Sequence, residues 1–195
     1  MSEPAIELEG VRKEFGRVIA VDHVDLSIPR GTFVGLIGHN GAGKSTCLRM
    51  LTGLLRPTQG RVRVLGVDVH AEPERSRQRM GAVPEHPALY EYMTGREFLA
   101  FIAEVRGGSG VDELLQRFDL AADGDRLVRE YSQGMRRKVA LAAALLGEPD
   151  VLILDEALNG LDPPSAAKVK ALLRERVDQG CCVLLSTHVV ETVEA

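Results

Sequence analysis

The stretch Gly38-His39-Asn40-Gly41-Ala42-Gly43-Lys44-Ser45 decides the fold of this sequence. It fits the phosphate-binding pattern G-x-x-x-x-G-K-[ST] at every fixed position. Residues 32–37 before it form an apolar run that predicts a buried strand, and residues 44–52 after it predict a helix. The alternative is a glycine-rich turn between two core elements. Because the pattern is rare by chance, we favour a phosphate-binding loop between a strand and a helix.

The residue types of the loop suit this chemistry. Its glycines let the backbone turn with positive φ and aim successive N–H groups inward, while the helix N-terminus adds partial positive charge. We expect Lys44 to reach the β- and γ-phosphates of a nucleotide and the Ser45 hydroxyl to bind Mg²⁺. The candidate phosphate-binding residues are Gly38, His39, Asn40, Gly41, Ala42, Gly43, Lys44, Ser45 and Thr46.

The composition narrows the class of protein. The chain has 195 residues, of which 45% are hydrophobic, and this suits one large domain or a core with a small lobe. The net charge of −4 argues against a nucleic-acid partner, and we interpret the basic runs 75–79 and 136–138 as solvated helix faces. The three cysteines lack metal or disulfide spacing, which is typical of a reduced, cytosolic protein. We expect neither a secretory signal nor a membrane span, because no apolar run is long enough.

Three stretches alternate apolar and polar side chains, as half-exposed antiparallel strands do. They cover residues 5–8, 18–28 and 61–65. We expect them to form a small antiparallel sheet beside the strand of the phosphate loop. Phe15 lies between the first two, and two roles are open for it: a buried core side chain, or an aromatic face that stacks on a purine ring.

The pattern changes after a short predicted strand at residues 80–83. Prolines at positions 84 and 87 stop regular structure there. Beyond them the apolar spacing is helical, and we predict helices over residues 94–106, 111–120 and 136–146.

Two more buried strands are predicted at residues 151–156 and 181–188. The helix between them is predicted to begin at Pro163 with Asp162 as its N-cap. Strands that alternate with helices indicate a mostly parallel sheet, whose ligand lies beyond the carboxyl ends of the strands. We therefore expect four residues at one sheet edge: Gly38, Asp155, Glu156 and His188.

Together these elements predict a single α/β domain over residues 1–195. Its core, with the mostly parallel sheet and the antiparallel part, would take about residues 1–85 and 139–195. A helical subdomain of about residues 86–138 would be inserted into this core.

The residues at the predicted edge suit phosphate-bond hydrolysis. Asp155 would lie next to the phosphate loop and hold Mg²⁺ on the Ser45 side or through a water. Glu156 would point to the opposite side and polarise a water for attack on the γ-phosphate. His188 would hydrogen-bond to the γ-phosphate and to this water. The alternatives are an acid pair that starts a helix, and a surface or core histidine.

Five motifs, in this order, resemble those of the nucleotide-binding subunit of an ABC transporter, and the resemblance covers nearly the whole chain. They are the phosphate loop, Ser132-Gln133-Gly134-Met135, the strand 151–156, Asn159-Gly160-Leu161-Asp162 and Ser186-Thr187-His188. The most specific is the Ser-x-Gly signature that opens a helix before the Asp-Glu strand, because other phosphate-loop NTPases lack it. The resemblance implies an ATPase that binds ATP and Mg²⁺.

In that family two subunits close head to tail on two ATP molecules. The resemblance therefore implies that the Ser132 side chain and the Gly134 backbone, with Gln133 between them, contact the γ-phosphate on the partner's loop. The Asp162 turn would cross the same interface and link the two sites. Ser132 can also act as the N-cap of its own helix, and both roles can hold together.

Several positions depart from the family pattern. Glu85 stands where a glutamine usually touches Mg²⁺ and relays the state of the membrane subunit. A carboxylate there could bind the metal more strongly, yet it adds negative charge beside Glu156. Gln133 takes the place of a glycine, and Phe15 replaces a tyrosine at the base-stacking position but keeps its aromatic face. Because relatives continue with further strands and helices, we expect the C-terminal end of the family domain to be missing at Ala195.

We therefore expect an ATP-hydrolysing subunit that drives a separate integral membrane subunit. Residues 92–97 and 131–135 look similar to bacterial export-type members, which favours export over import. The protein would pair with a second ATPase subunit, identical or not, and lie in the cytoplasm on the inner face of the cell membrane. Two alternatives stay open: a soluble ABC-type ATPase that acts on ribosomes or DNA, and a nucleotide-binding module with little turnover.

Overall fold

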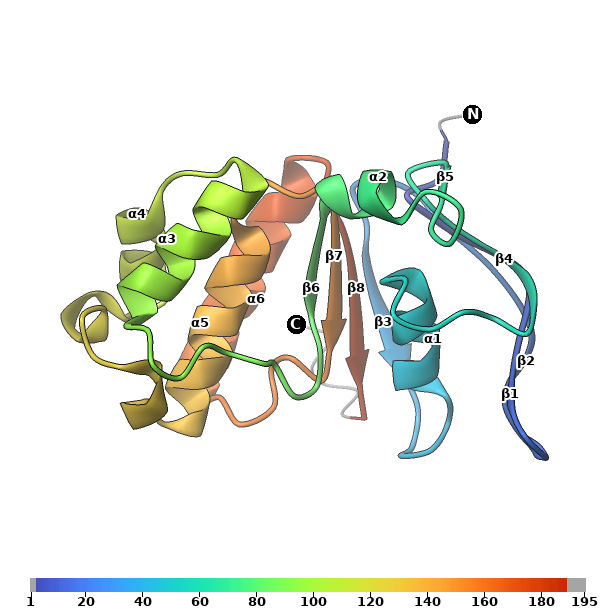
Figure 1. Ribbon diagram of the computed structural model, residues 1–195, viewed down its shortest axis with the longest axis horizontal. Helices are drawn as coiled ribbons and strands as arrows, with labels where there is room; N and C mark the ends of the chain where they lie inside the picture. Colours follow the sequence, from blue (N-terminus) through green and yellow to red (C-terminus); the bar gives the residue numbers. More distant parts are fainter. Residues whose placement is uncertain (1–2, 189–195) are drawn as a thin grey trace.

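The computed structural model describes residues 3–188, which form two sheets flanked by helices (Figure 1). The parallel sheet lies in the centre, the antiparallel sheet lies on one side of it, and most helices lie on the other. The predicted α/β class is confirmed. The expectation about the end of the chain at Ala195 falls outside the described residues.

The antiparallel sheet has the strand order β2-β1-β4-β5. Its strands are β1 (Ile6–Phe15), β2 (Val18–Ile28), β4 (Gln59–Val64) and β5 (Val67–Asp68). Ile6 pairs with Ile28 across β1 and β2, and both side chains are buried. Such cross-strand apolar pairs on one face explain the alternation in the sequence. The predicted small antiparallel sheet is confirmed.

Phe15 is the last residue of β1 and does not lie between two strands. Its side chain is 50% exposed, so the core role that the sequence left open is wrong. The ammonium nitrogen of Lys13 lies 5.0 Å from the centre of the Phe15 ring, as in a cation–π contact. Stacking on a purine ring stays a prediction for this side chain.

The central sheet has the order β3-β8-β7-β6, and all of its pairings are parallel. Its strands are β3 (Phe33–Ile37), β6 (Met80–Val83), β7 (Val151–Asp155) and β8 (Cys182–Thr187). Every residue of β7 and β8 is buried, as expected for inner strands covered on both faces. Asp155 pairs with Ser186, and Ile37 pairs with Thr187, so three strands end at the same edge of the sheet.

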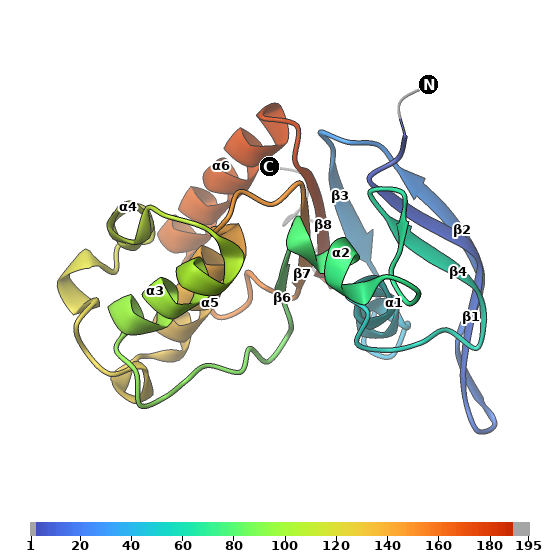
Figure 2. The same cartoon turned by 45° about the horizontal axis from the view of Figure 1, so that its top comes forward.

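Six α-helices pack around the sheets in the described part of the chain. They are α1 (Lys44–Leu51), α2 (Pro73–Gln78), α3 (Gly95–Arg106), α4 (Val111–Arg117), α5 (Gln133–Leu145) and α6 (Pro163–Asp178). Short 3₁₀ turns, η1 (Ala121–Asp123) and η2 (Val128–Glu130), lead into α5. Helix α1 lies between the two sheets, whereas α5 and α6 lie next to the parallel sheet with α3 and α4 farther out (Figure 2).

The caps explain where the helices at the site begin. The Ser132 hydroxyl accepts the Met135 N–H at 3.2 Å, so α5 starts at Gln133, before the predicted start at residue 136. Asp162 Oδ1 accepts the Ser165 N–H at 2.9 Å and caps α6, as predicted. Hydrogen bonds from the Ser165 N–H and hydroxyl lower the pKa of Asp162.

Buried apolar side chains form two clusters. One joins the antiparallel sheet and α1 to the parallel sheet, and the other joins the parallel sheet to α3, α4, α5 and α6. Helix α5 is continuous from 133 to 145, so it crosses residue 138, where the helical subdomain was predicted to end. The division into a core and a helical subdomain stays a prediction.

One basic run differs from its interpretation as a solvated helix face. Arg137 on α5 is buried, with only 7% of the residue exposed, because this face of the helix packs against the sheet.

Cys47, Cys181 and Cys182 are free thiols, in line with the absence of a disulfide framework. Between residues 3 and 188 no helix combines the length and the apolar character that a membrane span needs.

Candidate functional site

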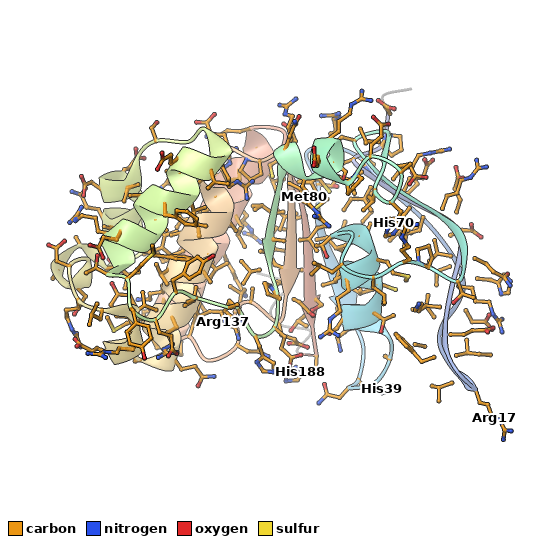
Figure 3. The ribbon with its side chains drawn as sticks, in the orientation of Figure 1. Arg17, His39, His70, Met80, Arg137 and His188 are labelled. Carbon is orange, nitrogen blue, oxygen red and sulfur yellow. The ribbon has the colours of Figure 1, made fainter. Side chains whose placement is uncertain are left out.

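The carboxyl ends of β3, β7 and β8 bring distant parts of the chain together. The phosphate loop follows β3, the acidic pair ends β7, and His188 follows β8. Figure 3 shows His39, His188 and Arg137 toward this same end of the sheet. The structure therefore assembles the edge that the alternation of strands and helices predicted.

The phosphate loop is closed around the Lys44 side chain. The Lys44 Nζ donates hydrogen bonds to the carbonyl oxygens of Gly38 at 2.7 Å and His39 at 3.2 Å, and the residue is 9% exposed. Gly43 has a φ of +85°, and a Cβ there would lie 2.3 Å from the Ala20 carbonyl oxygen. Only glycine fits at this position, which lets α1 begin directly behind the loop.

A cavity of about 310 Å³ opens above the loop. Most of its wall is the loop and the first turn of α1, while the loop after β6 and the end of β7 each contribute one carboxylate. The lining residues are Ala20, Asn40, Gly41, Ala42, Gly43, Lys44, Ser45, Thr46, Glu85 and Glu156. The structure thus places Glu85 and Glu156 at the same cavity as the predicted phosphate-binding residues 40–46.

The donor set of this cavity fits phosphate with Mg²⁺. Backbone N–H groups at a helix N-terminus and an ammonium group bind phosphate oxygens. The Ser45 hydroxyl and the Glu85 carboxylate line the same space, and both are oxygen ligands that Mg²⁺ accepts. In residues 3–188 no three His, Cys, Asp or Glu side chains form a metal site by themselves.

Ser186 joins the Asp155 side chain to the Glu156 backbone. Its hydroxyl donates to Asp155 Oδ1 at 2.6 Å and accepts the Glu156 N–H at 3.0 Å, and the residue is fully buried. The Glu156 backbone has a φ of +49°, which is uncommon for a residue other than glycine. This turn separates the two side chains: Asp155 faces Ser186, whereas Glu156 faces the phosphate loop.

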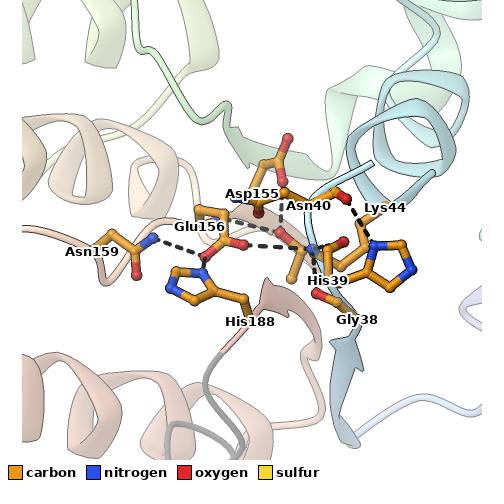
Figure 4. A network of polar contacts seen from close by, with 9 residues as sticks. Gly38, His39, Asn40, Lys44, Asp155, Glu156, Asn159 and His188 are labelled. Atoms are coloured by element: carbon orange, nitrogen blue, oxygen red, sulfur yellow. Dashed lines mark hydrogen bonds and ion pairs between the residues drawn. The ribbon is translucent and has the colours of Figure 1, made fainter. Parts of the chain in front are cut away.

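The Glu156 carboxylate is the centre of a polar network (Figure 4). Its Oε2 accepts the Asn159 Nδ2–H at 2.8 Å and lies 3.1 Å from the His188 Nδ1. Its Oε1 lies 3.7 Å from the Lys44 Nζ. The His188 side chain is 49% exposed, so one face of the imidazole is open to solvent. This arrangement can orient a carboxylate beside a bound phosphate and pass a proton away from it.

The remaining predicted residues do not line the cavity. Gly38, His39, Asp155 and His188 lie next to it at the same sheet edge, and the others lie on different elements. Phe15 is on the antiparallel sheet, and Ser132, Gln133 and Gly134 open α5. The structure places this helix start beside the turn before α6, since a Cβ at Gly134 would meet the Gly160 carbonyl oxygen at 3.4 Å. Residues 132–134 and the turn before Asp162 therefore lie close together, and neither segment lines the cavity.

Three residues of the site were missed from sequence. Ser186 and Asn159 each begin one of the five family motifs, and these positions could have indicated a role at the site. The sequence analysis assigned no role to either residue, although both contact the acidic pair. Arg137, whose guanidinium contacts the loop after β6, was misread as a solvated residue. A charged residue inside the apolar face of a helix was the available signal.

Ser186→Ala is expected to lower the free energy of unfolding by about 2 kcal/mol. The substitution removes a hydrogen bond to a carboxylate and leaves the Asp155 oxygen without this donor in a buried place. Urea denaturation measures the change, and the exposed Ser109→Ala serves as control, with an expected change within about 0.5 kcal/mol. Equal unfolding free energies for both variants would contradict the role of Ser186.

A protein-family model described as "ABC transporter" matches residues 21–159. The chain belongs to the ABC transporter family. The "Daunorubicin resistance ATP-binding protein DrrA3" of Streptomyces coeruleorubidus is 44% identical over 100% of the chain and 63% of the relative. The "Bacitracin transport ATP-binding protein BcrA" of Enterococcus faecalis is 35% identical over 98% of the chain and 64% of the relative. The chain thus spans less than two thirds of the length of these curated relatives.

Solved structures agree with this ABC transporter assignment. One, titled "Structure of ATP binding subunit of ABC transporter", superposes with a TM-score of 0.90 at 33% identity and covers 97% of this chain and 82% of that chain. Another is a dimeric post-hydrolysis state of an ATP-binding cassette bound to ADP and Pi. It superposes with a TM-score of 0.88 at 25% identity and covers 96% of this chain and 90% of that chain. The predicted family and the predicted ABC-type fold are confirmed.

Proposed function

We propose that the chain is the ATP-binding subunit of an ABC exporter and that it hydrolyses ATP to drive a separate membrane subunit. The observation that carries this proposal is the Glu156 carboxylate, held beside Lys44 at the cavity of the phosphate loop. A carboxylate in that place can act on a water next to a bound phosphate. The relatives named for daunorubicin resistance and bacitracin transport support the choice of an exporter.

The proposed reaction assigns roles to residues in and next to the cavity. The loop N–H groups and Lys44 hold the phosphates of ATP, and Glu156 accepts a proton from the attacking water. The oxygen of this water bonds to the γ-phosphorus while the bond to the β-phosphate oxygen breaks, which yields ADP and phosphate. His188, hydrogen-bonded to Glu156, orients the carboxylate and contacts the γ-phosphate. Mg²⁺, held by Ser45, Asp155 and Glu85, would screen the negative charge of the phosphates.

A second subunit is needed to complete this site. Ser132, Gln133 and Gly134 lie outside the cavity of their own chain, at a capped helix start beside the Asp162 turn. We propose that these three residues contact the γ-phosphate of the ATP bound to a second ATPase subunit. We also propose that Phe15 stacks on the base of the ATP bound to its own subunit. The dimeric ATP-binding cassette with ADP and Pi supports this arrangement.

The proposed place of the subunit is the inner face of the cell membrane, in the cytoplasm, against an integral membrane transporter subunit. The relatives' names describe ATP-binding proteins of resistance and transport, including a "Nod factor export ATP-binding protein I" that is 38% identical. These names favour the transporter over a soluble ATPase that acts on ribosomes or DNA.

The test is Mg²⁺-dependent phosphate release by the full-length natural protein, alone and with its co-expressed membrane subunit. We expect ATP binding, phosphate release, and faster release in the complex. ATP binding without phosphate release in both preparations would favour the alternative of a nucleotide-binding module with little turnover. Absence of binding at any protein concentration would contradict the proposal as a whole.

A further inference from the structure

Arg137 is a buried cation whose role the proposed reaction does not use. It lies on α5 with 7% of its surface exposed, and its Nη1 donates a hydrogen bond to the Pro84 carbonyl oxygen at 3.3 Å. Pro84 directly precedes Glu85, which lines the phosphate cavity. Within residues 3–188 the guanidinium has no carboxylate within 4.0 Å, so no direct ion pair offsets the desolvation cost of its burial.

Three carboxylates on two neighbouring elements act on the Arg137 charge. Glu85 lies on the loop after β6, and Asp155 and Glu156 lie at the end of β7. Burial lowers the pKa of Arg137, and these three carboxylates oppose that effect, with Glu85 the strongest of them. These carboxylates therefore offset part of the cost of burying the guanidinium.

The charge balance of the cavity shows why this cation matters. Glu85 and Glu156 line the cavity and Asp155 lies directly before Glu156, so three negative charges lie in or next to it, while Lys44 is the cation that contacts Glu156. Without Arg137 these residues would leave a net charge of about −2, and an ATP anion would have to enter against it. A buried positive charge at α5 lowers this repulsion without entering the cavity wall.

We propose that Arg137 is the positioning residue of the Pro84–Glu85 turn and the charge partner of Glu85. Its hydrogen bond holds the turn that presents Glu85 to the cavity, and its charge makes a carboxylate tolerable beside Asp155 and Glu156. The inference rests on the proposed function, because it concerns the same phosphate site.

A double-mutant cycle of Arg137→Gln and Glu85→Gln in the full-length natural protein tests the pairing. The affinity for ATP with a fluorescent label on the ribose is measured in excess EDTA, so that metal does not enter. We expect Arg137→Gln alone to weaken binding about tenfold, and to weaken it less than about threefold when Glu85→Gln is present. Arg137→Lys should recover most of the affinity, because it restores the charge.

The second readout is the urea midpoint of unfolding, measured without nucleotide. Arg137→Gln should lower the midpoint, and adding Glu85→Gln should recover about half of the loss. The matched control is Arg136→Gln on the same helix, whose ion pair is with Glu91 at 2.7 Å. The control should show no coupling to Glu85→Gln in either measurement.

Each outcome has one meaning. Equal effects of Arg137→Gln in both Glu85 backgrounds, or no recovery with Arg137→Lys, overturn the pairing and leave Arg137 as a packing residue. If Arg137→Gln unfolds the protein and the double variant folds, compensation is supported; if both unfold, it is overturned. Failure of the unaltered protein to bind the nucleotide contradicts the proposed function, while the urea cycle still decides the pairing.

Discussion

Glu156→Gln is expected to slow ATP hydrolysis at least about a hundredfold and to leave ATP binding intact. The amide keeps the shape and the hydrogen bond from Asn159, but it cannot accept a proton from the attacking water. ATP then stays bound, and two subunits stay closed on it. We expect gel filtration with ATP to show a dimer of Glu156→Gln where the unaltered protein elutes mainly as a monomer.

The matched control for this variant is Glu148→Gln. Glu148 also has a positive φ, of +49°, but it is exposed and lies outside the phosphate cavity. Its variant should hydrolyse ATP at the unaltered rate. A Glu156→Gln protein that stays monomeric with ATP would count against the closed dimer, and one that keeps its rate would remove Glu156 as the base.

Lys44→Ala is expected to weaken ATP binding at least about a hundredfold. The Lys44 Nζ already makes two hydrogen bonds to loop carbonyls, so it is held at the cavity in the absence of ligand. Loss of the ammonium removes charge-assisted hydrogen bonds to phosphate, each worth about 1.5–3 kcal/mol. It also leaves Glu156 without the cation 3.7 Å from its Oε1. Isothermal titration calorimetry with ATP measures the loss.

Lys168→Ala is the matched control for the loss of a lysine. Lys168 lies on α6 and pairs with Asp119 on the surface, so its variant should bind ATP with unchanged affinity. Circular dichroism should show that both variants are folded. Unchanged affinity of Lys44→Ala would show that the loop is not the nucleotide site.

Local patterns were enough for the elements that lie close together in the chain. The phosphate loop needs its glycines, lysine and serine within eight consecutive residues, and Gly43 shows why, since its φ of +85° favours glycine. The cap of α6 likewise depends on Asp162 and Ser165, three positions apart. The strand–loop–helix form and the cap were predicted correctly, because the interactions that decide them are short in sequence.

Other features depend on neighbours that are distant in the chain. Strand β1 extends to Phe15 because Phe15 pairs with Val18 of β2. The residue type at position 15 does not decide where the strand ends. Arg137 reads as a surface residue until α5 packs against β6 and its loop. Ser186 gains its role only when β8 aligns with β7, which puts its hydroxyl beside Asp155.

The sequence by itself determined the α/β class, the phosphate loop and the residues that end the parallel strands, because periodicity and turn chemistry act over a few residues. Only the tertiary structure decided how those residues meet. The parallel register of β7 and β8 and the positive φ of Glu156 place Asn159, His188 and Lys44 around one carboxylate. The packing of α5 places Arg137 against the Pro84 carbonyl oxygen. These contacts join residues far apart in the chain, so no local pattern contains them.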